Sequence, residues 1–171
     1  NYALAFSNAY VTTPPWSGYQ GLRASSTAIS SSHITLSCWF KNTNASHNFY
    51  FWGSGLGSAH SIRLQTNGTF YCPAAAGGSV YRYWDSTIAT PNIFDGNWYN
   101  IILYIPNSTA PALWDPADAK WYVNGIDLGA GVAIAWPQGA NEITDINGLF
   151  VSHSGGCEIS NWAYWLSDER A

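Results

Sequence analysis

Acidic side chains are the residues of this chain that could carry out hydrolysis, because glycoside cleavage usually needs two carboxyl groups about 5 to 10 Å apart. The chain has ten acidic residues, and they are scattered along its length. Glu142 and Asp145 are close in sequence, but their surroundings indicate a loop before a strand, and Asp168 with Glu169 lies in the terminal tail. The spacing therefore predicts no catalytic pair and a protein that is not an enzyme. A pair contributed by distant strands would leave no spacing signal, so a glycanase is kept as a disfavoured alternative.

The histidines and cysteines form no pattern typical of a metal or nucleophilic site. Zinc sites usually contain Cys or His residues that are close in sequence. The four histidines are instead widely separated along the chain: His33, His47, His60 and His153. The chain has no Gly-x-Ser-x-Gly motif and no phosphate-binding loop. Three cysteines cannot all pair within the chain. We expect buried thiols that pack as small hydrophobes, in preference to a disulfide, at Cys38, Cys72 and Cys157.

Composition limits the classes of partner. A length of 171 residues predicts a single domain spanning 1–171. Only 9% of the residues are charged, against about 25% in ordinary soluble proteins, so the surface must consist largely of small polar residues and aromatic edges. The net charge is −4 without a basic cluster, which argues against nucleic acid. No apolar run is long enough to predict membrane insertion. Such surfaces favour an extracellular, cell-surface or virion-surface location.

The elements that must position any site are short strands. Apolar residues alternate with polar ones along 34–41 and again along 99–105, which predicts strands with one buried face. Asn67-Gly68 and Asn124-Gly125 each separate two such runs and predict type I′ hairpin turns. Further strands are expected at 2–6, 8–12, 48–52, 61–65, 69–72, 80–84, 120–123, 126–128, 148–152 and 157–165. This pattern predicts an all-β fold, a two-sheet antiparallel jelly-roll sandwich.

Several motifs in order along the chain carry a family resemblance. They are the opening run from Tyr2 to Val11, the run Ile34-Thr35-Leu36-Ser37-Cys38-Trp39-Phe40-Lys41, Asp95-Gly96-Asn97-Trp98-Tyr99-Asn100-Ile101, Trp121-Tyr122-Val123-Asn124-Gly125, and the closing run from Ile159 to Glu169. With them the chain resembles the laminin-G-like branch of the concanavalin A-like lectin and glucanase superfamily. Tyr99 departs from the family pattern, which usually has a His there. We expect that difference to concern packing.

The resemblance implies a jelly-roll sandwich that is more often a binding module than a glycanase. Glycanases of the superfamily present Glu-x-Asp-x-Glu or a near variant on one strand, and this chain has no such spacing. The resemblance also implies that calcium is the cofactor to consider, held at the rim of the sandwich by six to eight oxygens. Asp115 and Asp118 are the candidate ligands, although solvated loop carboxylates explain them more readily.

The aromatic surplus points to the function. The chain has ten Trp, eleven Tyr and seven Phe, and we expect the core to hold Trp39, Phe40, Trp98 and Trp162. Rings left at the surface could stack on sugars or fill a protein interface. The candidate ligand-binding residues are Trp16, Tyr19, Tyr81, Trp84, Trp114 and Trp136.

These observations favour a non-catalytic module that recognises a glycan or a protein surface. A structural, decoration or fibre module of a phage or virus particle, packed against neighbouring subunits, is the alternative.

Overall fold

The chain forms two antiparallel sheets packed face to face. The computed structural model describes residues 3–6, 33–43, 45–46, 48–53, 61–72, 80–106, 117–135, 149–152 and 157–165. Twelve strands run through these ranges: β1 (Ala3–Phe6), β2 (His33–Asn42), β3 (Phe49–Gly53), β4 (Ser61–Leu64), β5 (Thr69–Cys72), β6 (Val80–Asp85), β7 (Tyr99–Pro106), β8 (Lys120–Val123), β9 (Ile126–Asp127), β10 (Val132–Ala135), β11 (Leu149–Ser152) and β12 (Cys157–Trp165). A short 3₁₀ helix, η2 (Ser86–Ile88), follows β6.

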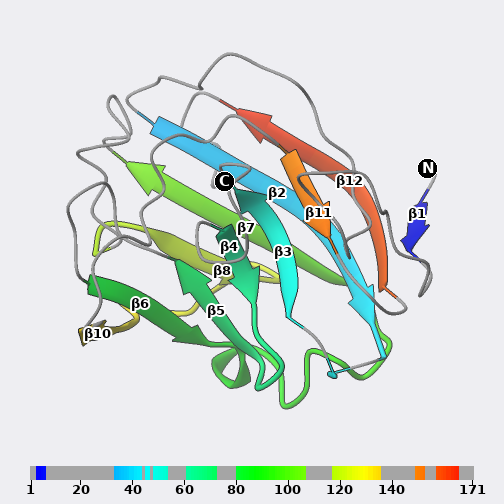
Figure 1. Cartoon of the computed structure of the whole chain (residues 1–171), viewed down its shortest axis with the longest axis horizontal. Helices are drawn as coiled ribbons and strands as arrows, with labels where there is room; N and C mark the ends of the chain where they lie inside the picture. The colour runs from blue at the N-terminus through cyan, green and yellow to red at the C-terminus, as the bar shows by residue number, and fades with distance from the viewer. Residues whose placement is uncertain are drawn as a thin grey trace, which may run out of the picture.

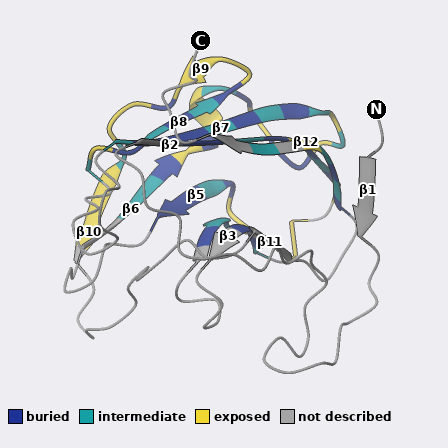
Figure 2. Cartoon of the chain, turned by 90° about the horizontal axis from the view of Figure 1, so that it is seen from above, coloured by how far each residue is buried: buried dark blue, intermediate teal, exposed yellow. Residues whose placement is uncertain are grey.

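Each sheet contains six strands. The first has the order β1-β12-β2-β7-β8-β9 and the second β10-β6-β5-β4-β3-β11. Figure 1 shows the long strands β2, β7 and β12 side by side, and Figure 2 shows the two sheets as separate layers. This confirms the predicted two-sheet antiparallel jelly-roll sandwich. No helix in the described ranges has both the length and the apolar composition that a membrane span requires.

The core lies between the sheets because the strands alternate as predicted. In β2 the inward residues Leu36, Cys38 and Phe40 are fully buried. They meet aromatic residues of the second sheet, and the Phe40 and Phe49 ring centroids are 4.7 Å apart. Trp121 of β8 stacks on Phe70 of β5 with centroids 4.3 Å apart. Two-residue periodicity therefore predicts which face of these strands is buried.

All three cysteines are buried and free. Cys157 pairs in register with Asn42, four residues from Cys38 along β2, or about 13 Å at the usual rise per residue. That separation is too large for a disulfide. Burial is the main cause that raises the pKa of each thiol, to about 12 for Cys157. The thiols therefore pack as apolar side chains.

Two turns that look alike in sequence differ in structure. Asn124 and Gly125 both have positive φ, 49° and 79°, as the predicted type I′ turn requires. At the other turn only Gly68 has positive φ. Its N–H donates to Gln65 O at 2.9 Å, and Gln65 N–H donates to Thr69 O at 2.8 Å. In this hairpin loop the glycine alone has a left-handed backbone, whereas a type I′ turn needs positive φ at both central residues. The type I′ prediction was therefore wrong at Asn67-Gly68.

Strand β10 was not predicted. Its sequence, Val-Ala-Ile-Ala, has no polar residue to alternate with the apolar ones. It pairs with β6 and ends the second sheet. The predicted strand at 8–12 lies outside the described residues.

Candidate binding face

Among the side chains that the structure describes, the outer surface of the first sheet presents one large exposed ring. Trp39 of β2 is 39% exposed, because it alternates with the core residues Cys38 and Phe40. It pairs with Ser160 of β12 on one side and with Asn100 of β7 on the other. Cross-strand partners project from the same face of a sheet. Trp39 therefore lies at the centre of a row of uncharged polar residues. Because its side chain is exposed on the outer face, the expectation that Trp39 belongs to the core was wrong.

The row continues to the Asn124-Gly125 hairpin. Asn124 Oδ1 accepts a hydrogen bond from Asn100 N–H at 2.8 Å, and Asn124 N–H donates to Asn100 O at 2.8 Å. These two bonds fix the hairpin tip beside β7. An amide side chain is thus anchored at the end of the row that contains Trp39.

An ion pair lies next to this row, two residues along the same strands. Lys41 Nζ donates to Glu158 Oε1 at 2.8 Å, with both side chains part-exposed. The same ammonium lies 5.7 Å from the ring centroid of half-buried Trp98. Trp98 is therefore not a fully buried core residue, contrary to the expectation from the sequence. The two charges neutralise each other next to Trp39.

A bulge lies on the other side of Trp39. Between Ser160 and Ala163 the register of β12 against β2 shifts, so that two residues of β12 stand opposite Cys38. Asn161 in this bulge is exposed and has φ of 49°, a left-handed conformation that asparagine tolerates better than most residues. Bulges redirect side chains and are common next to functional sites. This bulge places an exposed amide beside the Trp39 row.

The next row on the same face is more apolar. Ser37 pairs with Ile102, Ile102 with Tyr122, and Tyr122 with Asp127 of β9. Ile102 and Tyr122 are half-buried. Together with the Trp39 row they make the surface that we call the Trp39 face: Ser37, Trp39, Asn100, Ile102, Tyr122, Asn124 and Ser160. It combines an exposed indole with hydroxyl and amide groups.

One of the predicted binding residues lies in the core. Trp84 is fully buried, and its indole N–H donates to Gly129 O at 3.1 Å. Its ring face is covered by the core, including Trp121 at 6.2 Å, so the prediction that it contacts a surface ligand was wrong. The reason is that Trp84 pairs with Phe70 on the inner face of the second sheet.

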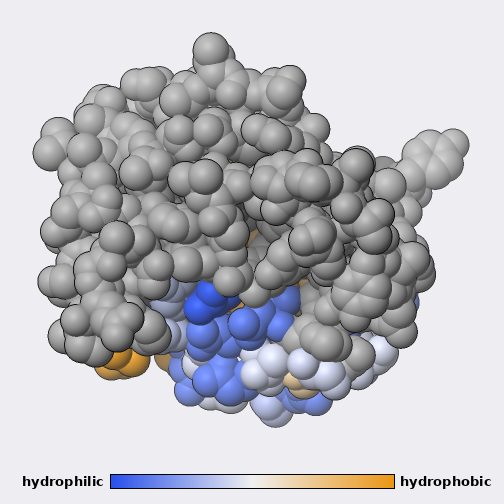
Figure 3. Space-filling model, in the orientation of Figure 1, coloured by the Kyte–Doolittle hydropathy of each residue, from blue (hydrophilic) through white to orange (hydrophobic). Residues whose placement is uncertain are grey.

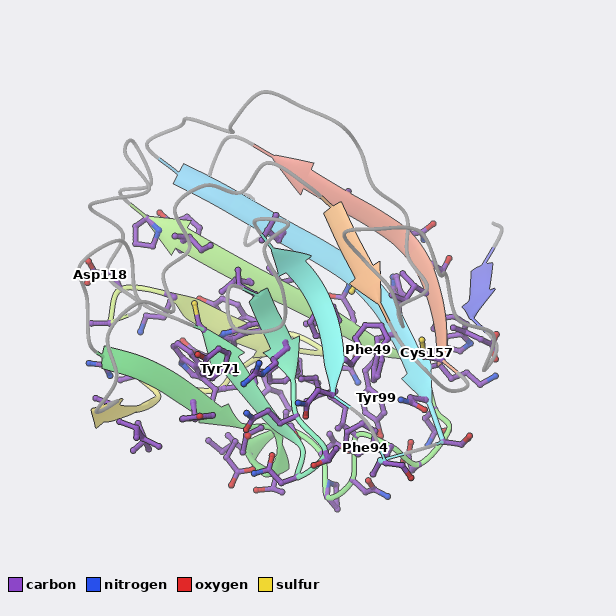
Figure 4. The ribbon with its side chains drawn as sticks, viewed as in Figure 1. Phe49, Tyr71, Phe94, Tyr99, Asp118 and Cys157 are labelled. Carbon is purple, nitrogen blue, oxygen red and sulfur yellow. The ribbon has the colours of Figure 1, made fainter. Side chains whose placement is uncertain are left out.

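The other predicted residues fall into two groups. Tyr81 lies on β6, opposite Ile134 of β10, and Asp118 is exposed just before β8 (Figure 4). The structure does not describe the remaining ones: Trp16, Tyr19, Trp114, Asp115 and Trp136. Trp162 lies in β12, and its side chain is outside the described part.

Within the described ranges no three His, Cys, Asp or Glu residues come together as metal ligands. Calcium binding stays a prediction.

The outer face of the second sheet also carries aromatic side chains, but its central ring is covered. Tyr71 is 4% exposed. It lies between Tyr83, with ring centroids 5.3 Å apart, and Arg63, whose guanidinium carbon lies 4.2 Å from the Tyr71 centroid. A ring so enclosed contributes packing and a cation–π contact. The Trp39 face is the better candidate site because its ring is accessible.

Tyr99 organises the loop that leads into β7. Its hydroxyl is 3.0 Å from Thr90 Oγ1 and donates to Asp95 Oδ2 at 2.8 Å. Asp95 also accepts from Asn97 N–H at 2.9 Å. The Asn97 backbone N–H is the largest cause that lowers the pKa of the Asp95 carboxyl, followed by the Tyr99 hydroxyl. Figure 4 shows Tyr99 beside Phe94 and Phe49 at this end of the sandwich. Tyr99 thus connects the loop before β7 to the sandwich through hydrogen bonds, while its ring packs in the core.

Replacing Tyr99 with phenylalanine should lower the free energy of unfolding by about 1–2 kcal/mol, because it removes hydrogen bonds at a buried position. Urea unfolding of both proteins measures this change.

The pKa of Asp95 lies below its ordinary value of 3.8 in the folded chain, so ionisation favours folding. That contribution is present above about pH 4 and is lost as the pH falls through the folded-state pKa. Asp95→Asn should therefore flatten the fall in stability below pH 4, and an unchanged acid profile would contradict this assignment.

No protein-family model matches the chain, and no curated protein does. Among solved structures it is similar to domains LG4-5 of the mouse laminin alpha1 chain, with 11% identity, a TM-score of 0.46, and coverage of 93% of this chain and 43% of that one. It is thus matched to less than half of that laminin chain.

Two other solved structures are similar at the same level. One is domain 4 of AbnA, a GH43 extracellular arabinanase from Geobacillus stearothermophilus, in complex with arabinotriose, at 17% identity and a TM-score of 0.42, covering 96% of this chain and 84% of that one. The other is the alginate lyase vAL-1 from Chlorella virus, at 12% identity and a TM-score of 0.39, covering 95% of this chain and 83% of that one. The fold assignment rests on the strand order and register of the chain itself, and no function follows from these similarities.

Proposed function

We propose that the domain is a non-catalytic binding module that recognises a neutral glycan on the Trp39 face. The observation that carries the proposal is the exposed indole of Trp39, paired across strands with Ser160 and Asn100. A flat ring suits the apolar face of a sugar, and flanking hydroxyl and amide groups suit its hydroxyls. Membership of the laminin-G-like branch, an extracellular or particle-surface location and the absence of catalysis are parts of the same proposal.

The charges next to Trp39 favour a neutral ligand. Lys41 and Glu158 bond to each other at 2.8 Å, so this pair offers an acidic glycan no unengaged cation. Recognition of an acidic sugar usually relies on such a cation for charge-assisted hydrogen bonds. A neutral glycan needs none, because stacking and uncharged hydrogen bonds suffice.

The stacking role of Trp39 is tested by Trp39→Ala. We would screen neutral polysaccharides, and alginate as an acidic one, by glycan array and then measure affinities by calorimetry. The domain should bind a neutral glycan and not alginate. Trp39→Ala should weaken that affinity at least tenfold, or by about 1.4 kcal/mol, as expected for a tryptophan at the centre of a binding surface. Trp39→Phe should retain part of the affinity.

The control is Ile88→Ala, which removes an exposed apolar side chain from η2. It should bind as the parent does, and circular dichroism should show that all variants fold. An array without a neutral-glycan hit, or affinity unchanged in Trp39→Ala, would overturn the proposal.

A further inference from the structure

Strand β10 forms an apolar and unprotected end of the second sheet. Val132 is 67% exposed and Ile134 43% exposed, and Ala133 is exposed between them. An apolar patch at the lower left of Figure 3 lies where Figure 1 places β10. Within the described chain, β10 pairs with β6 on one side and with no strand on the other.

Natural sheets protect such edges, and β10 lacks the usual protection. Edge strands commonly carry a charged residue, a proline or a bulge that prevents pairing with another chain. Val132–Ala135 contains no charge and no proline, and its register with β6 is regular over all four residues. At the edge of the first sheet, by contrast, the two-residue strand β9 contains the exposed Asp127. The edge at β10 is therefore suited to accept a further strand.

We propose that β10 pairs antiparallel with β10 of a second copy of the chain across a two-fold axis, so that the second sheet continues from one copy into the other. A two-fold axis perpendicular to the sheet keeps the outer faces of both copies on the same side. Cross-strand partners must project from the same face, so an outward residue can only oppose an outward residue. This condition limits the registers that are allowed.

The register centred on Ala133 satisfies the condition and uses both exposed side chains. Val132 pairs with Tyr83 and Ile134 with Tyr81 on β6, which places both on the outer face. With Ala133 opposite Ala133 of the partner subunit, Val132 lies opposite Ile134 of the partner subunit, and the reverse pair forms by symmetry. Each copy thus covers the apolar residues of the other, and half-buried Tyr83 extends the contact. The strand is complementary to itself.

Electrostatics do not oppose this pairing. Arg82 is the charged residue opposite Ala133 on β6, and its guanidinium donates to Ala130 O at 2.9 Å and Gly131 O at 3.3 Å. Two such arginines would be separated by three strand spacings, or about 14 Å. That exceeds the Debye length of about 8 Å at physiological ionic strength, so their repulsion is screened.

Sedimentation equilibrium of the chain tests the proposal. We expect a concentration-dependent monomer–dimer equilibrium, and Ile134→Lys should weaken association at least tenfold. Ile88→Lys is the matched control, since Ile88 is 57% exposed but lies in η2, away from the sheet edge. It should leave the dimer unchanged. A chain that is monomeric up to millimolar concentration, or a dimer that persists in Ile134→Lys, would overturn the proposal.

A crosslinking experiment tests the register separately. Residues directly opposite in antiparallel strands have Cα atoms about 4.5–5.5 Å apart, within disulfide range. Ala133→Cys should therefore form a disulfide-linked dimer under mild oxidation, while the three native cysteines are buried. Ile88→Cys is the control for random collision. Crosslinking of Ala133→Cys no faster than that of Ile88→Cys would exclude the proposed pairing.

Discussion

Replacing Trp121 with alanine should lower the free energy of unfolding by about 3–5 kcal/mol, the usual cost of removing a large buried aromatic side chain. Trp121 is fully buried. It stacks on Phe70 at 4.3 Å between centroids and contacts Phe51 and Trp84, each at 6.2 Å. It therefore joins β8 of the first sheet to three strands of the second. Chemical denaturation followed by circular dichroism measures the change.

The next residue provides the control. Tyr122 points to the opposite face of β8 and is half-buried. Tyr122→Ala should cost less than half as much, because it leaves the contact between the sheets intact. Equal losses for the two variants would contradict the assignment of Trp121 to the inner face.

Gly131→Ala should destabilise the chain more than Gly129→Ala, although both glycines have positive φ, 65° and 79°. A left-handed backbone costs a residue with a Cβ about 1–2 kcal/mol, and Gly129→Ala incurs only that cost, since nothing lies within 4 Å of its Cβ position. At Gly131 the Cβ would lie 2.6 Å from Trp84 Cε2. Such overpacking adds about 1–3 kcal/mol. Thermal unfolding of the two variants side by side measures the difference.

The position of Gly131 explains why this overlap is costly. It immediately precedes β10, and its carbonyl accepts from Arg82 at 3.3 Å. Trp84 is itself held by its hydrogen bond to Gly129 O, so moving the ring away from the new Cβ would strain this hydrogen bond. Equal melting temperatures for the two variants would show that the loop relaxes away from Trp84.

Periodicity predicted the fold well because the buried faces of the long strands obey it. Leu36, Cys38 and Phe40 alternate with residues that point outward, and the structure buries the first set. The same alternation places Trp39 on the outer face. The composition-based expectation that a tryptophan belongs in the core hid that signal. For Trp84 the error was the reverse, because the aromatic surplus led us to expect its ring at the surface and the structure buries it.

What could not be predicted depends on residues that are distant in sequence. The Trp39 row exists only because Ser160 and Asn100 come to lie on either side of β2. The difference between the Asn67-Gly68 and Asn124-Gly125 turns depends on the backbone conformation of a single asparagine, which the dipeptide does not specify. Strand β10 is recognisable only through its register with β6, since an all-apolar run has no period.

The pairing of β2 with β12 also determines when the Trp39 face can form during synthesis. Lys41 and Glu158, which bond across these strands, are 117 residues apart in sequence. A ribosome that has completed β2 and β7 must therefore still produce most of the remaining chain before β12 arrives. Such non-local pairing makes folding slow and leaves strand edges exposed meanwhile. Until β12 docks, one edge of β2 stays unpaired beside the Trp39 ring, so we expect the nascent chain to be prone to misassociation along this edge, next to the proposed binding face.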